Sequence, residues 1–352
     1  MSQSNILQIG GFDIPPGKTL QIEMPVVRLY TDTDISMPVH VIRSKKPGPT
    51  VFVSAAVHGD ELNGVEILRR LIKQKNFRLS AGTLIFVPMV NVYGVLNQSR
   101  YMPDRRDLNR CFPGSSKGSL AGIVAHKFLS EIVAHCEYGI DLHTGAKHRS
   151  NLPQIRANLN DAETLELAEA FGVPVLLNAS IRDGSLRQAA VEMGAKVLLY
   201  EAGEALRFDE LSIRAGVRGI HNVLAKLNML SKTQRKSTKK PPVKPFVANT
   251  SNWTRATASG IVNSLKNLGD MVQKNDPLAR IGSPFGDLFD VVRASRAGII
   301  IGKQNIPLVQ EGEAMFHIAY FTEEDKEIFD NIETMQDMLM PDEMDDVDDS
   351  AT

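Results

Sequence analysis

The feature that most constrains the fold is an alternation of short apolar runs with helical patterns from residue 51 to residue 230. The runs "TVFVSAAV", "TLIFVPMV" and "KVLLYEAG" have the length of buried strands, and "ELNGVEILRRLIKQ" has the apolar spacing of a helix. Strands that alternate with helices of roughly 10 to 15 residues are typical of α/β domains. We therefore expect an α/β domain over residues 51–230, with a mixed, mainly parallel sheet flanked by helices.

The segments on either side of this domain have a different character. Residues 1–50 contain two stretches of alternating residues, "VVRLYTD" and "VHVIRS", and turn signals at "PPGK" and "KKPGPT". We expect a β-rich segment here that packs on the α/β domain. Residues 231–246, "SKTQRKSTKKPPVKPF", are basic, contain prolines and lack periodicity, which predicts a linker or an exposed loop.

Residues 247–320 contain an internal repeat. "VQKNDPLARI" is similar to "VQEGEAMFHI", and each follows a glycine and an apolar run. Two such hairpin units predict a small all-β domain, which resembles the barrel-sandwich fold of biotinyl and lipoyl carrier domains. Those carriers present a lysine at the tip of a central hairpin, whereas "GSPFGDLFDVV" at this place contains none. We therefore expect a structural domain, or one that covers an active site.

The charge of the chain is unevenly distributed. The net charge is only −1, yet residues 322–352 hold thirteen acidic residues and one lysine. The tail over residues 321–352 is therefore expected to be acidic and partly disordered. The rest of the chain is basic, which suits a small anionic substrate but fits equally well with surface lysines that keep a protein in solution.

Several cellular roles are not expected from this sequence. No apolar run approaches the roughly 20 residues that span a bilayer, and the N-terminus lacks the features of a signal peptide. The two cysteines, Cys111 and Cys136, give no disulfide framework, and we expect a cytoplasmic protein without a membrane partner. The one dense basic run lacks interleaved aromatic residues, so no nucleic-acid partner is expected. The sequence is compatible with a homo-oligomer.

Titratable side chains follow three of the apolar runs. His58 and Glu61 come after the first run, Asp141 and His143 close "YGIDLH", and Glu201 closes "KVLLYE". Ligands of open α/β sheets bind beyond the carboxyl ends of the strands, and parallel strands end at the same edge. We therefore expect these side chains to converge, although they are far apart in the sequence.

Two histidines and one carboxylate, with a fourth position open to water, are the ligands of many catalytic zinc sites. We predict one Zn²⁺ per chain, held by His58, Glu61 and His143. A further carboxylate outside the ligand set is needed to take a proton from the zinc-bound water and to pass it to the leaving nitrogen. Glu201 is the candidate for this general base.

Two aspartates lie close to these ligands in the sequence. Asp60 and Asp141 are expected to orient the imidazole rings by accepting their N–H groups. The H-x-x-E spacing alone is a weak signal, because a histidine near a glutamate is more often a surface or core feature than a ligand. The sequence has no H-E-x-x-H and no glycine-rich phosphate loop. A helical zincin site and nucleotide chemistry are therefore not expected.

The segment "NQSRYMPDRRDLNRCFPG" concentrates positive charge between the two parts of the ligand set. It holds four arginines within eleven positions. Because guanidinium groups match carboxylates with two parallel hydrogen bonds, such a loop could hold an anionic substrate. The alternative is a solvated loop laced by ion pairs, which we favour for Arg105 and Arg106. Arg187, at the start of a predicted helix, is either a substrate ligand or an ordinary surface residue.

The order and spacing of four motifs add a resemblance to these arguments. "HGDE", "SRYMPDRRDLNRCFPG", "DLHTG" and "YEAG" occur in this order over residues 50–230. The chain thereby resembles the succinylglutamate desuccinylase/aspartoacylase family of the zinc carboxypeptidase superfamily. The resemblance implies a zinc carboxypeptidase-like α/β fold with a C-terminal β domain, and it implies the same zinc ligands and the same catalytic glutamate.

The resemblance also implies roles for other residues. Asn109 and Arg110 in "DLNR" match the pair that binds the substrate carboxylate. Arg100 resembles the arginine that helps to polarise the scissile carbonyl, and Arg187 resembles a substrate-binding arginine that precedes the glutamate strand. The C-terminal domain of aspartoacylases also supplies a tyrosine to the pocket. Here Tyr320 lies at the end of that domain but without a matching motif.

The function expected from residues and resemblance together is a zinc-dependent amidohydrolase. It would remove an acyl group from a small anionic N-acyl amino acid or a similar small amide, by attack of zinc-bound water. Two alternatives stay open: a zinc carboxypeptidase that acts on a peptide or protein tail, and a non-catalytic binding protein with the same fold. The acyl group is not identified by the sequence.

Overall fold

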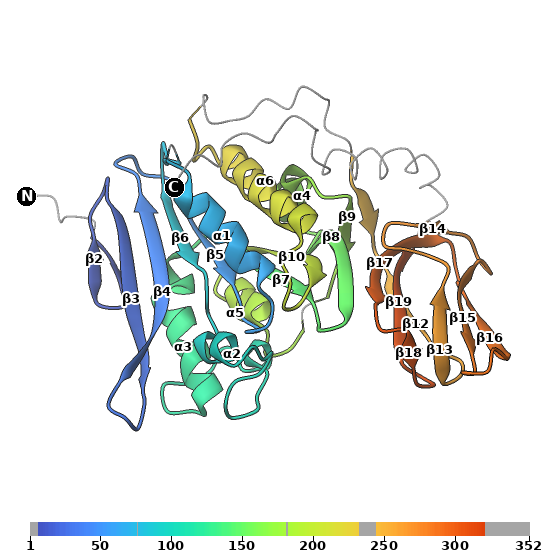
Figure 1. Ribbon diagram of the computed structural model, residues 1–352. Coiled ribbons are helices and arrows are strands. Elements are labelled where there is room, and N and C mark those ends of the chain that lie inside the picture. The colour runs from blue at the N-terminus through green and yellow to red at the C-terminus, as the bar shows by residue number, and fades with distance from the viewer. Residues whose placement is uncertain (1–5, 76, 181, 232–243, 321–352) are drawn as a thin grey trace, which may run out of the picture.

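The computed structural model describes residues 6–75, 77–180, 182–231 and 244–320, and one 13-stranded sheet runs through this part of the chain (Figure 1). The predicted linker lies largely outside the described residues, and the acidic tail lies wholly outside them. The strands before residue 230 are β1 (Leu7–Ile9), β2 (Phe12–Ile14), β3 (Thr19–Arg28), β4 (Asp34–Arg43), β5 (Thr50–Ala55), β6 (Thr83–Val87), β7 (Tyr138–Gly145), β8 (Arg149–Ala157), β9 (Val175–Asn178) and β10 (Lys196–Glu204).

The centre of the sheet is parallel. β5 pairs in parallel with β6 on one side and β7 on the other, and β7 pairs in parallel with β10. All five residues of β6 and five of the six in β5 are buried. Unbroken apolar runs of this kind suit strands that are covered on both faces, as parallel strands are.

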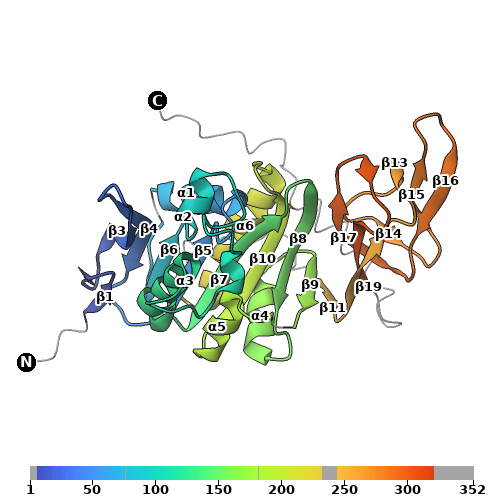
Figure 2. The same cartoon turned by 90° about the horizontal axis from the view of Figure 1, so that it is seen from below.

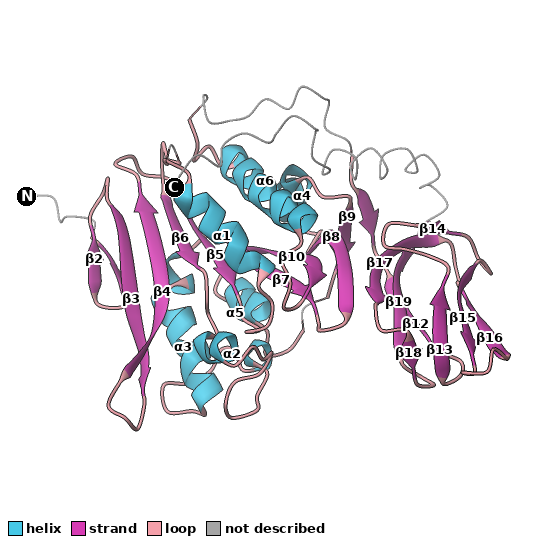
Figure 3. Ribbon diagram, in the orientation of Figure 1, coloured by secondary structure: helices cyan, strands magenta, loops and turns pink. Residues whose placement is uncertain are grey.

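Helices cover both faces of this centre (Figure 3). The helices are α1 (Asn63–Lys73), α2 (Val92–Leu96), η1 (Leu108–Arg110), α3 (Leu120–Glu131), η2 (Val133–His135), α4 (Ala162–Phe171), α5 (Leu186–Glu192) and α6 (Glu210–Lys226). α1, α4 and α6 share one apolar core with the sheet, whereas α3 and α5 share a second core on the opposite face. The strands are thereby held in a helix–sheet–helix sandwich.

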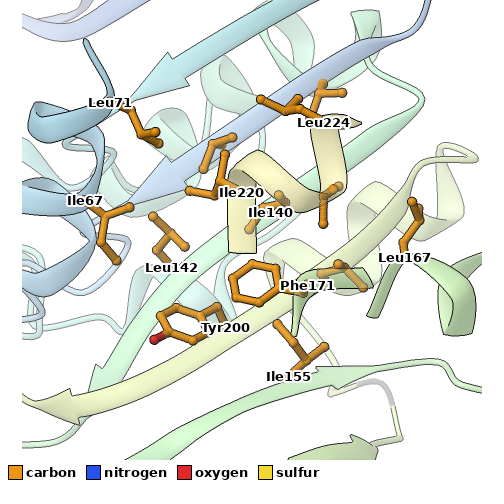
Figure 4. Packing of buried hydrophobic residues seen from close by; sticks show 14 of the residues in the cluster. Ile67, Leu71, Ile140, Leu142, Ile155, Leu167, Phe171, Tyr200, Ile220 and Leu224 are labelled. Carbon is orange, nitrogen blue, oxygen red and sulfur yellow. The ribbon is translucent and has the colours of Figure 1, made fainter. Parts of the chain in front are cut away.

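The packing on the first face is shown in Figure 4, where side chains of α1, α4 and α6 meet those of the central strands. Phe171, at the end of α4, lies with its ring centroid 5.1 Å from that of Tyr200 on β10. The Tyr200 hydroxyl donates a hydrogen bond to the carbonyl oxygen of Ser212 in α6 at 2.7 Å. This core fixes β10, and therefore the strand end that carries Glu201.

Antiparallel strands extend the sheet at both ends (Figure 2). β4 pairs antiparallel with β6 and with β3, so residues before the α/β region complete one edge. β8 pairs antiparallel with β10, and β17 (Gly298–Gln304) pairs antiparallel with β8. β1 and β2 form a small separate sheet.

The C-terminal strands form two sheets. They are β11 (Phe246–Ala248), β12 (Ser251–Arg255), β13 (Gly260–Ser264), β14 (Met271–Val272), β15 (Pro277–Gly282), β16 (Leu288–Arg293), β17 (Gly298–Gln304), β18 (Leu308–Val309) and β19 (Ala314–Tyr320). The large sheet includes β11, β12, β14, β17 and β19, and β16-β15-β13-β18 form a second sheet. Residues of both sheets share an apolar core of their own.

The predicted α/β fold with a large mixed sheet and flanking helices is confirmed, and the C-terminal strands are consistent with the predicted β domain. The sequence did not indicate that these strands would continue the α/β sheet through the β8–β17 pairing. The boundaries at 1–50, 51–230, 231–246, 247–320 and 321–352 stay our proposal for the domains. None of the helices in the described ranges is long and apolar enough to cross a membrane.

Candidate metal centre and active-site cavity

Three predicted ligands meet at the carboxyl ends of β5 and β7. His58 and Glu61 lie between β5 and α1, and His143 lies on β7. One donor atom of each residue lies within 4.8 Å of the donors of the other two. Glu61 sits between the rings, with Oε1 2.8 Å from Nδ1 of His58 and Oε2 2.7 Å from Nδ1 of His143. All three side chains are buried, so these donors face one another away from bulk water.

The backbone after β5 explains why glycine follows His58. A Cβ at Gly59 would lie 1.9 Å from the carbonyl carbon of Gly94 in α2. Real side chains do not approach a backbone so closely, so only glycine allows this turn to pack against α2. Ala56, just before, has a positive φ of 52°. The chain therefore turns sharply after the strand and brings His58 back toward β7.

The second nitrogen of each imidazole contacts an aspartate. His143 Nε2 is 2.8 Å from Oδ2 of Asp141, and His58 Nε2 is 3.0 Å from Oδ1 of Asp107. A carboxylate in this position fixes the ring and strengthens the opposite nitrogen as a ligand. Both Nδ1 atoms therefore face Glu61 while both Nε2 atoms are held from behind. Two nitrogens and a carboxylate arranged in this way fit a divalent ion such as zinc.

The role that the sequence suggested for Asp60 has to be corrected. The described hydrogen bonds include none between Asp60 and an imidazole, and its Oδ1 is buried without a partner among the described residues. Asp107, from the "DLNR" loop, contacts His58 instead. Asp141 reaches His143 because residues two apart on a strand point to the same side. Asp60 lies in a turn, where neighbouring residues point in different directions.

The charges within this cluster shift the pKa values of its members. Burial alone would raise the pKa of Glu61, but the two imidazoles hold it well below its usual range. Burial alone would lower the pKa of His143, but Asp141 and Glu61 raise it well above its usual value. The pKa of His58 is raised as well, since Glu61 and Asp107 outweigh its burial. Glu61 therefore stays negatively charged, and its charge stabilises positive charge on the neighbouring imidazole rings.

Glu201 lies one strand away from this cluster. It pairs with His143 across β10 and β7, and with Gln154 across β10 and β8. Because adjacent strands are about 4.8 Å apart, these residues form a row across the sheet. The side-chain amide of Asn151 donates to Oε2 of Glu201 at 2.6 Å. One carboxylate oxygen is thus fixed by the protein.

Arg100 lies directly beside the ligand cluster. Its guanidinium donates to Oε1 of Glu61 and to Oδ2 of Asp107, each at 3.1 Å. The side chain is only partly exposed, and burial by itself would lower its pKa. The two carboxylates outweigh this effect and raise the pKa, so the group carries its charge at the edge of the candidate metal centre.

The "DLNR" loop is tied to α5. Oδ1 of Asn109 accepts a hydrogen bond from the backbone N–H of Leu186 at 2.8 Å. Arg110, the next residue, donates from Nη1 to the carbonyl oxygen of Asn109. Arg187 follows Leu186 in α5 and is only 6 % exposed. The structure therefore brings these three predicted substrate ligands to one place, although residues 109 and 187 are far apart in the sequence.

The predicted site residues, apart from the aspartates, line one cavity of about 630 Å³. These lining residues are His58, Glu61, Arg100, Asn109, Arg110, His143, Arg187 and Glu201. Tyr320 is not among them, and its hydroxyl lies 3.1 Å from Oγ of Ser295 instead. The aspartates Asp141 and Asp107 stand behind the imidazoles rather than in the cavity wall.

Sequence reasoning missed part of the cavity. Arg156 on β8, Arg182 after β9, and Trp253 and His317 of the C-terminal strands also line it. The Trp253 and His317 rings are stacked, with centroids 4.9 Å apart. The tryptophan is the only one in the chain, and its position in a small β-rich segment is a signal that could have drawn attention to it.

Comparison with known families bears on this cavity. The sequence model described as the Succinylglutamate desuccinylase/Aspartoacylase catalytic domain matches residues 47–227. The chain belongs to this family. The matched segment contains every site residue that the sequence predicted. Trp253 and His317 lie beyond it, so this member of the Succinylglutamate desuccinylase/Aspartoacylase family lines its cavity partly with residues from outside the matched catalytic domain.

Individual relatives agree with this assignment. The N-alpha-acetyl-L-2,4-diaminobutyric acid deacetylase of Halomonas elongata is 27 % identical over 299 residues, which are 82 % of this chain and 87 % of that protein. The product-bound Ectoine utilization protein EutE (DoeB) of Ruegeria pomeroyi superposes with a TM-score of 0.76 at 24 % identity, over 88 % of this chain and 98 % of that one.

A second solved structure has the same fold. The succinylglutamate desuccinylase/aspartoacylase of Rhodobacter sphaeroides gives a TM-score of 0.74 at 24 % identity, over 86 % of this chain and 96 % of that one. At this identity the likeness concerns the fold. Because so much of both chains is covered, the fold shared within the Succinylglutamate desuccinylase/Aspartoacylase family extends beyond the matched catalytic domain.

Proposed function

We propose that this protein is a zinc-dependent amidohydrolase that removes an acyl group from an N-acyl amino acid or a similar small amide. One observation carries the proposal: the donors of His58, Glu61 and His143 share a cavity with Glu201, which lies a single strand away. Membership of the family and the deacetylase named as a relative support the same class of reaction.

We assign His58, Glu61 and His143 as ligands of one zinc ion per chain. When bound, zinc lowers the pKa of a water molecule and polarises an amide carbonyl. Asp107 and Asp141 accept the Nε2–H groups of the two rings, so the Nδ1 lone pairs are free to ligate.

Glu201 is the proposed general base and acid. It takes a proton from the attacking water and then delivers it to the leaving nitrogen of the tetrahedral intermediate. Asn151 holds Oε2, which leaves Oε1 to carry the proton. A well-placed group of this kind typically accelerates a reaction by about 10² to 10⁴.

Arg100 is proposed to stabilise the negative charge that develops on the carbonyl oxygen. Glu61 and Asp107 hold its guanidinium in place before the substrate binds. A donor that needs no rearrangement during the reaction is most effective, and one such donor is typically worth about 3 kcal/mol of the barrier.

Asn109, Arg110 and Arg187 are proposed to bind a carboxylate of the substrate. They lie together because Asn109 is hydrogen-bonded to the first turn of α5, which also carries Arg187. A guanidinium matches a carboxylate with two hydrogen bonds, so this group fixes the amide relative to Glu201.

The cavity favours a small amide over a peptide. Its volume of about 630 Å³ suits a ligand of low molecular mass. Trp253 and His317 of the C-terminal strands form part of its wall. A carboxypeptidase acting on a protein tail needs an open groove at this wall, so it is the less favoured candidate.

Hydrolysis of N-acetyl, N-succinyl and other N-acyl amino acids by the zinc-loaded protein tests the proposal. We expect activity that a chelator abolishes and zinc restores, and no release of C-terminal residues from peptides. Glu201→Gln should lower kcat by about a thousandfold while one zinc per chain remains bound. Glu169→Gln, an exposed change on α4, is the matched control and should act like the wild type.

Two outcomes would decide against this function. Near-normal turnover by Glu201→Gln with zinc bound would refute the assignment of the general base. Failure to bind any metal under metal-replete conditions would favour a non-catalytic binding protein.

A further inference from the structure

The carboxylate of Glu201 accepts a single side-chain hydrogen bond within the described part of the chain. The amide nitrogen of Asn151 donates to its Oε2 at 2.6 Å. Arg156 also approaches, but its Nε lies 3.8 Å from Oε1, which is too long for a hydrogen bond. Asn151 is only 8 % exposed, so water competes little for its amide. The direction of the Glu201 carboxylate therefore depends on Asn151.

An irregular pairing of two strands brings Asn151 to Glu201. Glu201 of β10 lies opposite Gln154 of β8, whereas Gly203 lies opposite Asn151. Residues 201–203 of β10 thus face residues 151–154 of β8, which is one residue more, and the register shifts between them. Such bulges change the direction of a side chain and are frequent beside active sites. Here the bulge leaves Asn151 diagonal to Glu201, at a separation that side chains can bridge.

Asn151 lies between two glycines of the neighbouring strands. Its partner on β10 is Gly203, and its partner on β17 is Gly302. Residues directly opposite each other in a sheet have Cβ atoms only about 5 Å apart, so their side chains share the same space. Because neither partner has a side chain, neither competes with the Asn151 amide for the space beside Glu201.

The two glycines are needed for different reasons. Gly203 has a positive φ of 73°, and a Cβ there would lie 2.5 Å from Nδ2 of Asn63. It therefore permits the backbone of β10 to turn after Glu201. A Cβ at Gly302 would lie 3.0 Å from Oδ1 of Asn151. An added methyl group at residue 302 would thus press on the same amide that holds Glu201.

The strand that carries Gly302 is fixed to both neighbouring strands of the catalytic region. Nε2 of Gln154, on β8, donates to the carbonyl oxygen of Ile301 at 3.2 Å. Asn305, directly after β17, donates from Nδ2 to Oε2 of Glu204 on β10 at 2.7 Å. These contacts lie on either side of Gly302 in the sequence. β17 is therefore held in register, and Gly302 stays opposite Asn151.

We propose that Asn151 is the positioning residue of the general base, and that Gly302 keeps its amide directed at Glu201. By holding one carboxylate oxygen, the amide prevents rotation of the carboxylate and leaves the other oxygen to take up and deliver the proton. This inference rests on the proposed function. It goes beyond that function because a strand outside the matched catalytic domain then sets the geometry of the base.

Asn151→Leu tests the hydrogen bond, because leucine has nearly the shape of asparagine but no N–H group. For the N-acyl amino acid that the zinc-loaded full chain hydrolyses fastest, kcat should fall about 100-fold, as for a misplaced catalytic group. KM and zinc content should stay within about threefold of the wild type, because neither depends on this amide. A residue that only fills space would leave kcat nearly unchanged. Asn263→Leu, the same change at an exposed position of β13, is the matched control.

A double-mutant cycle shows whether Asn151 acts through Glu201. In the Glu201→Gln background, Asn151→Leu should change kcat by less than about twofold, because the group that it positions is already lost. The same loss of kcat in both backgrounds would mean that Asn151 acts independently of Glu201, and it would refute the proposal.

Gly302→Ala tests the packing without removing any polar group from the cavity. We expect kcat to fall about tenfold. A crystal structure of the variant should show the amide nitrogen of Asn151 more than about 3.5 Å from Oε2 of Glu201, beyond hydrogen-bond distance. Gly118→Ala, in an exposed loop where an added Cβ meets no atom closer than 3.3 Å, is the control. An unmoved amide, or a displaced amide with the kcat of the wild type, would refute the proposal.

The wild type and Asn151→Leu together separate this inference from the function on which it rests. If the wild type hydrolyses N-acyl amino acids and Asn151→Leu keeps its kcat, the inference is refuted and the proposed function stands. If the zinc-loaded wild type hydrolyses none of them, both are refuted. Zinc content and melting temperature confirm that each variant is folded.

Discussion

The two walls of the cavity differ in how completely the protein satisfies its own polar groups. On the wall formed by β5 and β7, each imidazole nitrogen of His58 and His143 faces a carboxylate oxygen at 2.7 to 3.0 Å. On the opposite wall, Arg156, Arg187 and His317 each keep a buried nitrogen without a partner. Among the described residues, hydrogen bonds therefore satisfy the nitrogens of the first wall completely and those of the second only in part.

This contrast teaches what each wall is built to do. A metal ligand must point in a fixed direction before the ion arrives, and a network of carboxylates behind the rings supplies that order. A substrate subsite must keep its donors free, because a donor that is already bonded gains little from the substrate. Satisfied groups therefore mark the proposed metal centre, whereas the other wall keeps buried nitrogens without a partner among the described residues.

Among the variants of the two walls, removal of a metal ligand is expected to have the largest effect on zinc content and kcat. His143→Ala should lose zinc and lower kcat by about 10⁴ or more, because both the polarised water and the polarised carbonyl depend on the ion. Zinc content by atomic absorption and kcat on the best N-acyl substrate measure this. Exposed His135→Ala in η2 should match the wild type in both, and a zinc-replete, active His143→Ala protein would rule out the assigned ligand set.

A smaller effect on zinc binding or activity is expected when the aspartates that contact Nε2 of the imidazoles are substituted. Asp141→Asn and Asp107→Asn should each weaken zinc binding or activity by about 10- to 100-fold, because the ring loses the acceptor that orients it. Asp60→Asn should change either quantity less than about threefold, since the described hydrogen bonds include none between Asp60 and an imidazole. Competition with a chromophoric chelator gives the zinc affinities. Equal losses for all three variants would contradict the assignment of Asp107 as the partner of His58.

How much of this could be read from the sequence also differs between the two walls. The strand ends at His58, His143 and Glu201 were predictable because parallel strands finish at one edge of a sheet, so motifs far apart in the chain meet there. The contact of His58 with Asp107 instead of Asp60 was not predictable, since it depends on where the "DLNR" loop folds over the ligands.

The second wall was beyond sequence reasoning for a different reason. Arg156 lies on β8, a strand that no clear apolar alternation predicted, and it pairs with Leu199 of β10 and Leu177 of β9, which are distant in the sequence. His317 lies on β19, which belongs to the large sheet through its pairing with β17 and the pairing of β17 with β8. Local patterns predicted the helices and the central strands, but they do not encode which edge of a sheet another segment will extend.

The smallest effect expected concerns stability and tests the unsatisfied wall without a substrate. An imidazole in the unfolded chain takes up a proton as the pH falls through about 6.5, whereas buried His317, facing Arg156 and Arg182, stays neutral until a pH of about 3. Below pH 6.5 the unfolded state therefore binds the additional proton, and the wild type loses stability as the pH falls.

His317→Phe removes this linkage while keeping a ring beside Trp253. Between pH 7.5 and 5.5 the wild type should lose about 1 kcal/mol more of its free energy of unfolding than the variant does. Urea denaturation of both metal-free proteins at several pH values, followed by tryptophan fluorescence, measures the difference. Parallel profiles of the free energy of unfolding against pH would mean that His317 takes up its proton in the folded protein as well. A charged ring beside two arginines would then require an anion or a rearranged wall already in the absence of substrate.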